Sequence, residues 1–270
     1  MFEIFSYSFM QRAFIIGNLV AIIAPIIGVF IVLKRLSMIG HTLSHVALAG
    51  VAIGLITGIY PVYTAILITV FAGLGVEKLR RTYQDYAEIS LAIILATGLG
   101  LATILISLSG NMAGIHSYLF GSISLITTRD IYIILPLTIL IIALVFVFYY
   151  GFFFLAFSEQ DSRLAGIPVK LLNFLFIILI SLTVSLSMRV IGALLVSSLL
   201  TLPVATSLQL AKSFKGSIFY AILFSLLSVN TGLVISFYWD LAPGGTIIMV
   251  GVLYLLLVMT YNKIKAVIIN

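Results

Sequence analysis

His41 and His45 lie four residues apart in the sequence. Residues at this spacing share one face of a helix, so both imidazoles can reach the same divalent metal ion. The pair lies in a stretch of 41 residues, from Leu36 to Val76, that contains no Lys, Arg, Asp or Glu. Titratable side chains within such an apolar stretch are rare and usually face a polar path or a partner. The pattern therefore favours a helix that passes a metal ion across a membrane.

The histidines also have a structural interpretation, in which each ring binds a backbone carbonyl group and holds neighbouring helices in register. Two nitrogens are an incomplete zinc site, because structural zinc takes four ligands. A second copy of the chain, related by a two-fold axis, would supply two more imidazoles. Because the chain has no cysteine, any metal must be bound through nitrogen and oxygen. The residues between the histidines include no Glu, so the general base of a His-Glu-x-x-His metalloprotease is missing, and we expect no enzyme activity.

The helix with the histidine pair also carries a packing signal. Gly50, Gly54 and Gly58 recur at every fourth residue, which is the small-residue pattern that lets two helices approach closely. At 100° per residue, Gly50 lies 180° around the helix from His41. We expect the glycine face to pack tightly, while the opposite face presents the histidines.

The composition indicates that the protein folds in lipid. Hydrophobic residues make up 63% of the 270 residues and charged residues only 8%, against roughly 45–50% and 25% in soluble domains. We expect one transmembrane domain over residues 1–270. The chain contains no phosphate-binding loop of the Gly-x4-Gly-Lys-Ser/Thr type, so ATP-driven transport would need an ATPase on another chain. The net charge of +6 reflects membrane orientation, and we expect no nucleic-acid partner.

Charge-free runs of about 20 apolar residues locate the segments that cross a bilayer. Nine such segments occur, and an odd number places the two termini on opposite sides. The predicted spans are Ala13–Leu33, Ile39–Ile59, Val62–Val76, Ile89–Leu108, Ile131–Phe157, Leu171–Met188, Val190–Leu210, Gly216–Tyr238 and Gly244–Tyr261.

Lysine and arginine set the orientation, because cytoplasmic loops are enriched in both. With the N-terminus outside and the C-terminus in the cytoplasm, eleven basic residues face inward, and only Arg12, Arg129 and Arg189 face outward. The apolar segment Ile115–Thr128 is 14 residues long, and counting it as a span would invert everything that follows. We expect instead a short helix that enters the outer half of the membrane and returns.

A group of polar residues follows the fifth predicted span. Glu159, Gln160, Asp161 and Arg163 lie within five residues, and Gly166 follows as a helix-ending signal. One interpretation is a solvated cytoplasmic turn. The other is a short surface helix that docks into a partner subunit.

Asp240 and His116 are weaker candidates for metal-binding residues. Asp240 is the only carboxylate on the predicted outer side in the last third of the chain. It could attract a cation at the mouth of a pore or pair with Arg189 across a loop. A lone histidine such as His116 more often has a structural role than a ligand role.

Five motifs stand in order along nearly the whole chain. They are YSFMQRAF at 7–14, VLKRLSMIGHTLSHVALAGVAIG at 32–54, SYLFGS at 117–122, GALLVSSLLTLP at 192–203 and FYWD at 237–240. In this order they resemble the permease subunits of the ABC importers for zinc, manganese and iron, in particular zinc permeases of the ZnuB/AdcB type.

The resemblance implies an all-α fold of the vitamin-B12-permease-like type II ABC importer kind. Such a fold has about eight or nine transmembrane helices, a short outer-half helix and a cytoplasmic coupling helix. It implies a homodimer in the cell membrane, two cytoplasmic ATPase subunits and an extracytoplasmic metal-binding protein. The coupling helix matches Glu159–Gly166, which favours the docking interpretation for Glu159, Gln160, Asp161, Arg163 and Gly166.

The resemblance also implies metal ligands. The channel motif matches Gly40–His45, and His45 matches the family histidine. In many relatives an Asp stands in place of His41, and an Asp or Glu commonly stands in place of Asp240. Exchange of a carboxylate for imidazole favours Zn²⁺ over Mn²⁺.

We therefore expect Zn²⁺ as the transported substrate and no permanently bound cofactor. The alternatives are a manganese or iron importer of the same family and a proton-coupled secondary metal carrier. The secondary carrier would need titratable groups along the path, and the spans offer few besides the histidines.

Overall fold

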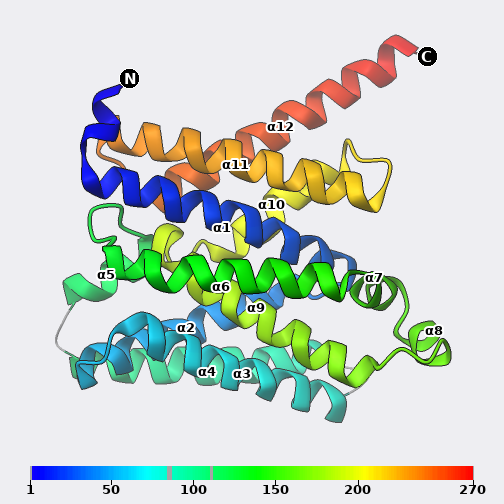
Figure 1. Cartoon of the computed structure of the whole chain (residues 1–270), viewed down its shortest axis with the longest axis horizontal. Coiled ribbons are helices and arrows are strands. Elements are labelled where there is room, and N and C mark those ends of the chain that lie inside the picture. Colours follow the sequence, from blue (N-terminus) through cyan, green and yellow to red (C-terminus); the bar gives the residue numbers. More distant parts are fainter. Residues whose placement is uncertain (1, 84–86, 110–111, 270) are drawn as a thin grey trace.

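The computed structural model describes residues 2–83, 87–109 and 112–269, and these residues form helices joined by turns and loops (Figure 1). Apolar segments become helices here because lipid offers no partner to backbone N–H and C=O groups. The elements are η1 Phe2–Ser6, α1 Ser8–Leu33, α2 Met38–Thr57, α3 Pro61–Thr82, α4 Ala87–Ser109, α5 Met112–Phe120, α6 Thr128–Val147, α7 Tyr149–Phe157, α8 Glu159–Leu164, α9 Val169–Ile191, α10 Val196–Leu208, α11 Phe214–Trp239 and α12 Pro243–Ile269.

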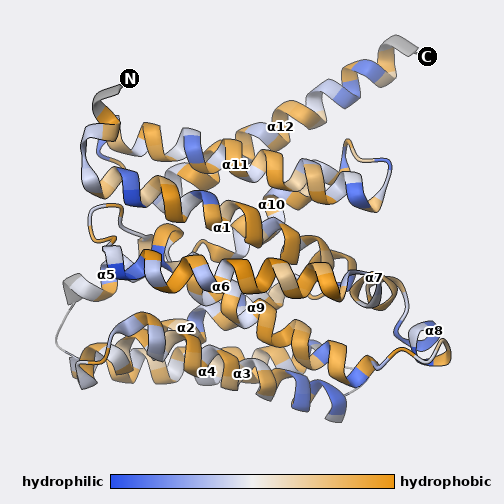
Figure 2. Cartoon of the chain, viewed as in Figure 1, coloured by the Kyte–Doolittle hydropathy of each residue, from blue (hydrophilic) through white to orange (hydrophobic). Residues whose placement is uncertain are grey.

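Eight of the described helices are long and apolar enough to cross a membrane, and this confirms the all-helical, multi-pass fold class. They are α1, α2, α3, α4, α6, α9, α11 and α12. The helices run side by side, with the N-terminus at the left and the C-terminus at the right of the view (Figure 1). Apolar residues cover the middle of the bundle, and polar residues gather near the helix ends (Figure 2). The arrangement is that of a bundle whose ends face water.

One predicted boundary, near Arg189, differs from the structure. The sequence interpretation ended one span before Arg189 and began the next at Val190, but α9 continues through Arg189 to Ile191. The chain then turns at Gly192, which has a φ of 88°, and only 13 residues remain for α10. The positive charge of Arg189 predicts a loop at this position. In the structure the residue lies inside the protein and is only 5% exposed.

Two other segments differ in length from a simple span. The 27-residue run Ile131–Phe157 is divided at Phe148 into α6 and α7. The ambiguous segment Ile115–Thr128 contains the end of the nine-residue helix α5, followed by an irregular connection to α6. A short helix therefore occurs where one was predicted, and it lies at the same end of the bundle as the N-terminus (Figure 1).

Candidate metal site

Helix α2 carries both histidines and packs closely against α3. A Cβ atom added at Gly50 would lie 2.7 Å from Cα of Ala65, and one added at Gly54 would lie 2.5 Å from Oγ1 of Thr64. Only glycine permits this approach of the two helices. The prediction that this face packs tightly is confirmed for Gly50 and Gly54. It is wrong for Gly58, which ends α2 with a φ of 72° and has no neighbour within 4 Å at that position.

A second neighbour, α4, also packs closely against α2. A Cβ atom added at Gly98 would lie 2.5 Å from Cγ2 of Val46 and 3.3 Å from its Cα. Val46 directly follows His45 in the chain. Helix α2 is therefore held by close contacts with both α3 and α4, and these contacts define the position of the histidine pair.

The two imidazole rings lie against each other. The ring centroids of His41 and His45 are 4.6 Å apart, and the ring planes meet at 84°. His45 is 8% exposed, whereas His41 is partly buried. Nδ1 of His45 is buried and has no hydrogen-bond partner among the described residues. A buried polar nitrogen without a partner is costly, so this atom is suited to bind a cation.

The described residues do not form a complete set of metal-binding side chains around the histidine pair. The described residues contain no group of three or more His, Cys, Asp or Glu side chains that could hold a metal ion. His41 and His45 supply at most two nitrogens, and zinc takes four ligands. The remaining ligands are therefore not His, Cys, Asp or Glu side chains of the described residues. An incomplete ligand set is also what a transport site needs, since the ion must be able to leave.

Asp240 lies apart from the histidines. It ends α11 in the left-handed conformation, with a φ of 50°, and its side chain is exposed. Helix α11 ends where α12 begins, at the left of Figure 1, whereas α2 begins at the opposite end, after α1. The structure does not bring Asp240 to the histidine pair, and its role at a pore mouth stays a prediction.

The structure pairs Arg189 with Asp130 in the interior. Nε of Arg189 lies 3.2 Å from Oδ2 of Asp130, and the two side chains are 6% and 0% exposed. The Tyr60 hydroxyl donates to Oδ1 of Asp130 at 2.6 Å, and the Thr127 N–H donates to Oδ2 at 2.8 Å. Nη2 of Arg189 donates to the carbonyl oxygen of Leu125. The network joins the turn before α3, the start of α6 and the end of α9.

The network also affects Tyr60, which lies between α2 and α3. Burial and the hydrogen bond to Asp130 raise the pKa of Tyr60 to about 12. The Arg129 guanidinium lies 4.6 Å from the centroid of the Tyr60 ring. The turn that follows the histidine helix is therefore held against α6 by a neutral phenol that contacts the buried Asp130 carboxylate and the exposed Arg129 guanidinium.

The sequence does not predict this network, although it carries one local signal for it. Thr127 and Asp130 form a capping box, in which each side chain accepts a hydrogen bond from the backbone of the other. That spacing is readable from sequence and predicts the start of α6. The partner Arg189 is 59 residues away in the chain, and no local pattern identifies it.

The predicted surface helix is present as α8. The Ser158 hydroxyl accepts the N–H of Asp161 at 3.1 Å and caps the helix. Nη2 of Arg163 lies 3.4 Å from Oε1 of Glu159, one turn earlier. Gly166 follows with a φ of 75°, which a residue with a side chain rarely adopts. Gln160 and Asp161 are exposed on this helix. Its role in coupling stays a prediction.

Lys34 connects the end of α1 to the start of α9. Its Nζ donates to Oδ1 of Asn173 at 2.6 Å. Burial and the nearby Arg80 lower the pKa of Lys34 to about 8, while Glu159 and Glu77 act in the opposite direction. The end of the bundle that holds α8 thus contains a partly buried lysine among several charged side chains.

The fold and the central histidine helix define a multi-pass membrane permease. Comparison with known families agrees, because the ABC 3 transport family matches residues 6–262. The chain belongs to this family and is a metal-transport ABC permease of the cell membrane.

Individual relatives cover most of the chain. A probable metal transport system membrane protein of Treponema pallidum is 37% identical over 258 residues, which are 96% of this chain and 97% of that protein. The zinc uptake protein ZnuB of Haemophilus influenzae is 30% identical, with coverages of 87% and 91%. The manganese transport protein MntC of Listeria monocytogenes is 29% identical, with coverages of 90% and 87%.

A solved structure is similar as well. PsaBC from Streptococcus pneumoniae, in complex with Fab, superposes with a TM-score of 0.85 at 27% identity, and the match covers 96% of both chains. Relatives named for different metals are similar to this chain over most of their length, so membership of the family alone leaves the metal open.

Proposed function

We propose that this chain is the membrane subunit of an ATP-driven importer of Zn²⁺. The observation that carries the proposal is the pair of adjacent imidazoles, with centroids 4.6 Å apart, on the enclosed helix α2. Imidazole nitrogen suits Zn²⁺, whereas Mn²⁺ prefers carboxylate and water oxygen. The unpartnered Nδ1 of His45 supports a ligand role for this residue over a purely structural one.

The proposed transporter is a homodimer with two cytoplasmic ATPase subunits and an extracytoplasmic metal-binding protein. In the proposed mechanism the binding protein releases the ion near Asp240, on the side of the N-terminus. The ion then enters a path at the dimer interface, where His45 and His41 of both copies supply up to four nitrogens. ATP hydrolysis on the partner moves α8 and thereby the spans, in an alternating-access cycle. In this mechanism the chain binds the metal ion transiently and catalyses no covalent reaction.

Uptake into cells or proteoliposomes tests the proposal, with Zn²⁺ and Mn²⁺ measured separately. We expect His45→Ala to lose most Zn²⁺ uptake while the protein level in the membrane is unchanged. His116→Ala is the matched control, because His116 stacks on Phe120 in α5 and belongs to no proposed ligand set. Zn²⁺ uptake by His45→Ala equal to that of His116→Ala would refute the proposal.

Manganese import is the second candidate, since MntC is similar over most of its length. His41→Asp distinguishes the two candidates, because it introduces the carboxylate that the family resemblance implies at this position. For a zinc importer, this substitution should lower Zn²⁺ uptake relative to Mn²⁺ uptake. A wild-type protein that imports Mn²⁺ in preference to Zn²⁺ would favour the second candidate.

A proton-coupled carrier would respond differently to the energy source. Dissipating the proton gradient at constant ATP should leave uptake unchanged if the importer is ATP-driven. Loss of uptake under that condition would identify a secondary carrier instead.

A further inference from the structure

The histidine pair of α2 has a close neighbour in the short helix α10. A Cβ atom added at Gly40, which precedes His41, would lie 3.7 Å from Cα and 3.9 Å from Cβ of Ser197. It would also lie 2.8 Å from Cδ1 of Leu200, one turn later in α10. The first turns of α2 and α10 are therefore in contact, directly beside the first histidine.

The start of α10 carries three hydroxyl side chains on one side. Ser197, Ser198 and Thr201 fall within a sector of about 100° of the helix, and all three are partly exposed. The Thr201 hydroxyl donates to the carbonyl oxygen of Ser197 at 2.9 Å. The hydroxyl groups of Ser197 and Ser198 make no hydrogen bond within the described part of the chain. These three residues form the hydroxyl face of α10.

The hydroxyl face differs from the serine and threonine residues of the preceding helix, α9. There each hydroxyl donates to the carbonyl oxygen of the residue four positions earlier, as seen for Ser181, Thr183, Ser185 and Ser187. Such bonds satisfy a polar group where lipid offers no partner. Two partly exposed hydroxyls without such a bond are therefore suited to face water or a polar ligand.

A second group without a partner lies on the neighbouring helix. Nδ1 of His45 is buried and has no hydrogen-bond partner among the described residues. Imidazole nitrogen and hydroxyl oxygen can both contact a divalent cation, but the hydroxyl adds no negative charge. The partial positive charge at the amino end of α10 also opposes tight binding of a cation there. The hydroxyl face thus suits an ion that passes and leaves, as transport requires.

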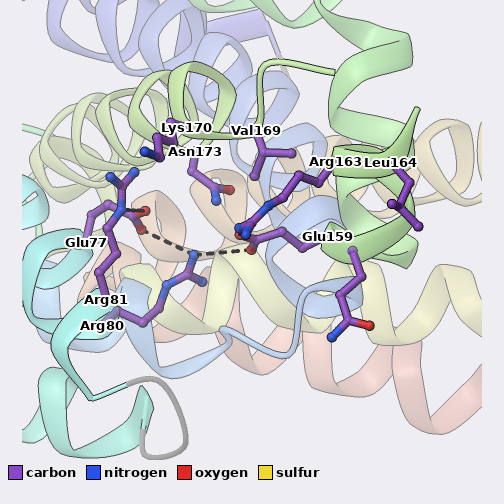
Figure 3. Close-up of a pocket in the computed structure, with 10 residues that line it drawn as sticks. Glu77, Arg80, Arg81, Glu159, Arg163, Leu164, Val169, Lys170 and Asn173 are labelled. Carbon is purple, nitrogen blue, oxygen red and sulfur yellow. Dashed lines mark hydrogen bonds and ion pairs between the residues drawn. The ribbon is translucent and has the colours of Figure 1, made fainter. Parts of the chain in front are cut away.

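The charged cavity at the other end of the bundle does not offer such contacts. This cavity has a volume of about 940 Å³ and lies between α3, α8 and α9 (Figure 3). Its charged side chains comprise four cations and two carboxylates, namely Arg80, Arg81, Arg163, Lys170, Glu77 and Glu159. Both carboxylates already pair with arginine, at 3.3 Å for Glu77 and Arg80 and at 3.4 Å for Glu159 and Arg163. The excess positive charge disfavours a divalent cation in this cavity.

We propose that the hydroxyl face of α10 completes the metal path beside the histidine pair. Ser197, the residue in contact with α2, supplies an oxygen contact to the ion, and Ser198 and Thr201 bind water that the ion carries. The inference rests on the proposed function, because it concerns the same ion and the same path. It assigns to α10 part of the ligand set that His41 and His45 do not provide.

A single introduced thiol tests this position without an uptake measurement. The chain contains no cysteine, so Ser197→Cys introduces its only thiol. In membrane vesicles that contain the full-length chain, this thiol should react with a small charged methanethiosulfonate. Zn²⁺ at about ten times its apparent Kd should slow the reaction about tenfold, because only about a tenth of the sites stay free. The protection should disappear when His45→Ala is combined with Ser197→Cys.

Thr231→Cys is the matched control for the labelling. Thr231 is a partly exposed residue of α11, and its hydroxyl lies 3.4 Å from that of Tyr254 on α12. We expect no protection of this variant by Zn²⁺.

Two further variants test the hydroxyl without adding a thiol. Ser197→Ala should raise the apparent KM for Zn²⁺ uptake about threefold to tenfold, which is the effect of losing one hydrogen-bonding contact. Ser197→Thr keeps the hydroxyl and should restore the KM of the wild type. Both variants are compared at equal protein levels in the membrane.

Three results would overturn the inference and leave the proposed function intact, provided that the wild type imports Zn²⁺. The first is protection of Ser197→Cys that is no stronger than that of Thr231→Cys. The second is protection that persists in the presence of His45→Ala, since the thiol would then bind Zn²⁺ independently of the histidines. The third is an unchanged KM in Ser197→Ala. Failure of the wild type to import Zn²⁺ would instead refute the proposed function together with this inference.

Discussion

The buried pair of Asp130 and Arg189 provides the sharpest test of the structure. Asp130→Asn removes the carboxylate that faces Nε of Arg189 at 3.2 Å and the Tyr60 hydroxyl at 2.6 Å. The Arg189 side chain is 6% exposed, so its charge would remain inside the protein without a counter-charge. We expect Asp130→Asn to reduce the stability of the protein strongly.

The magnitude follows from the cost of an unpaired buried charge. Removing one partner of a buried ion pair typically costs about 3–5 kcal/mol. The double variant Asp130→Asn with Arg189→Gln removes both charges and leaves two amides that can bind each other. Its loss should therefore be smaller than the sum of the two single losses, by about 1–3 kcal/mol.

The free energy of unfolding in mixed micelles, measured by titration with SDS, checks this cycle. Arg163→Gln serves as a control because its partner Glu159 is 41% exposed and the pair lies at the surface. Such surface pairs contribute about 0–1 kcal/mol. A loss for Asp130→Asn no larger than that of Arg163→Gln, or strictly additive losses in the cycle, would refute the assigned pairing.

Two further predictions concern packing and pH. Gly50→Leu should lower the free energy of unfolding by about 1–3 kcal/mol or more, because its Cβ would lie 2.7 Å from Cα of Ala65. Gly100→Ala is the control and should show no loss in the same titration, because no atom lies within 4 Å of a Cβ at that position. Equal losses for the two variants would contradict the packing of α2 on α3. The second prediction follows from the pKa of Lys34, which is lowered from 10.5 to about 8 in the folded protein. Between these values the unfolded chain binds more protons than the folded one, so the contribution of Lys34 to stability rises with pH through this window. Wild type should therefore gain stability relative to Lys34→Met as the pH rises from about 8 to 10, and parallel pH profiles of the two proteins would contradict the burial of this amine.

Sequence alone identified the membrane fold because the rules involved are local. A charge-free run forms a spanning helix since lipid penalises both exposed backbone and ionised side chains. The shared face of His41 and His45 follows from helix geometry alone. Gly166 likewise predicts the end of α8 from the local sequence. Each of these inferences depends only on residues within one continuous segment of the chain.

Only the tertiary structure placed Arg189 inside the protein and formed the cavity beside α8. A charged residue in an apolar sequence predicts a loop unless a counter-charge is available, and Asp130 becomes available only when α6 packs near α9. Similarly, Arg80, Glu159 and Lys170 lie on three separate segments that meet at one end of the bundle. Charge and burial at such sites depend on which distant helices lie side by side, and a local sequence pattern does not contain that information.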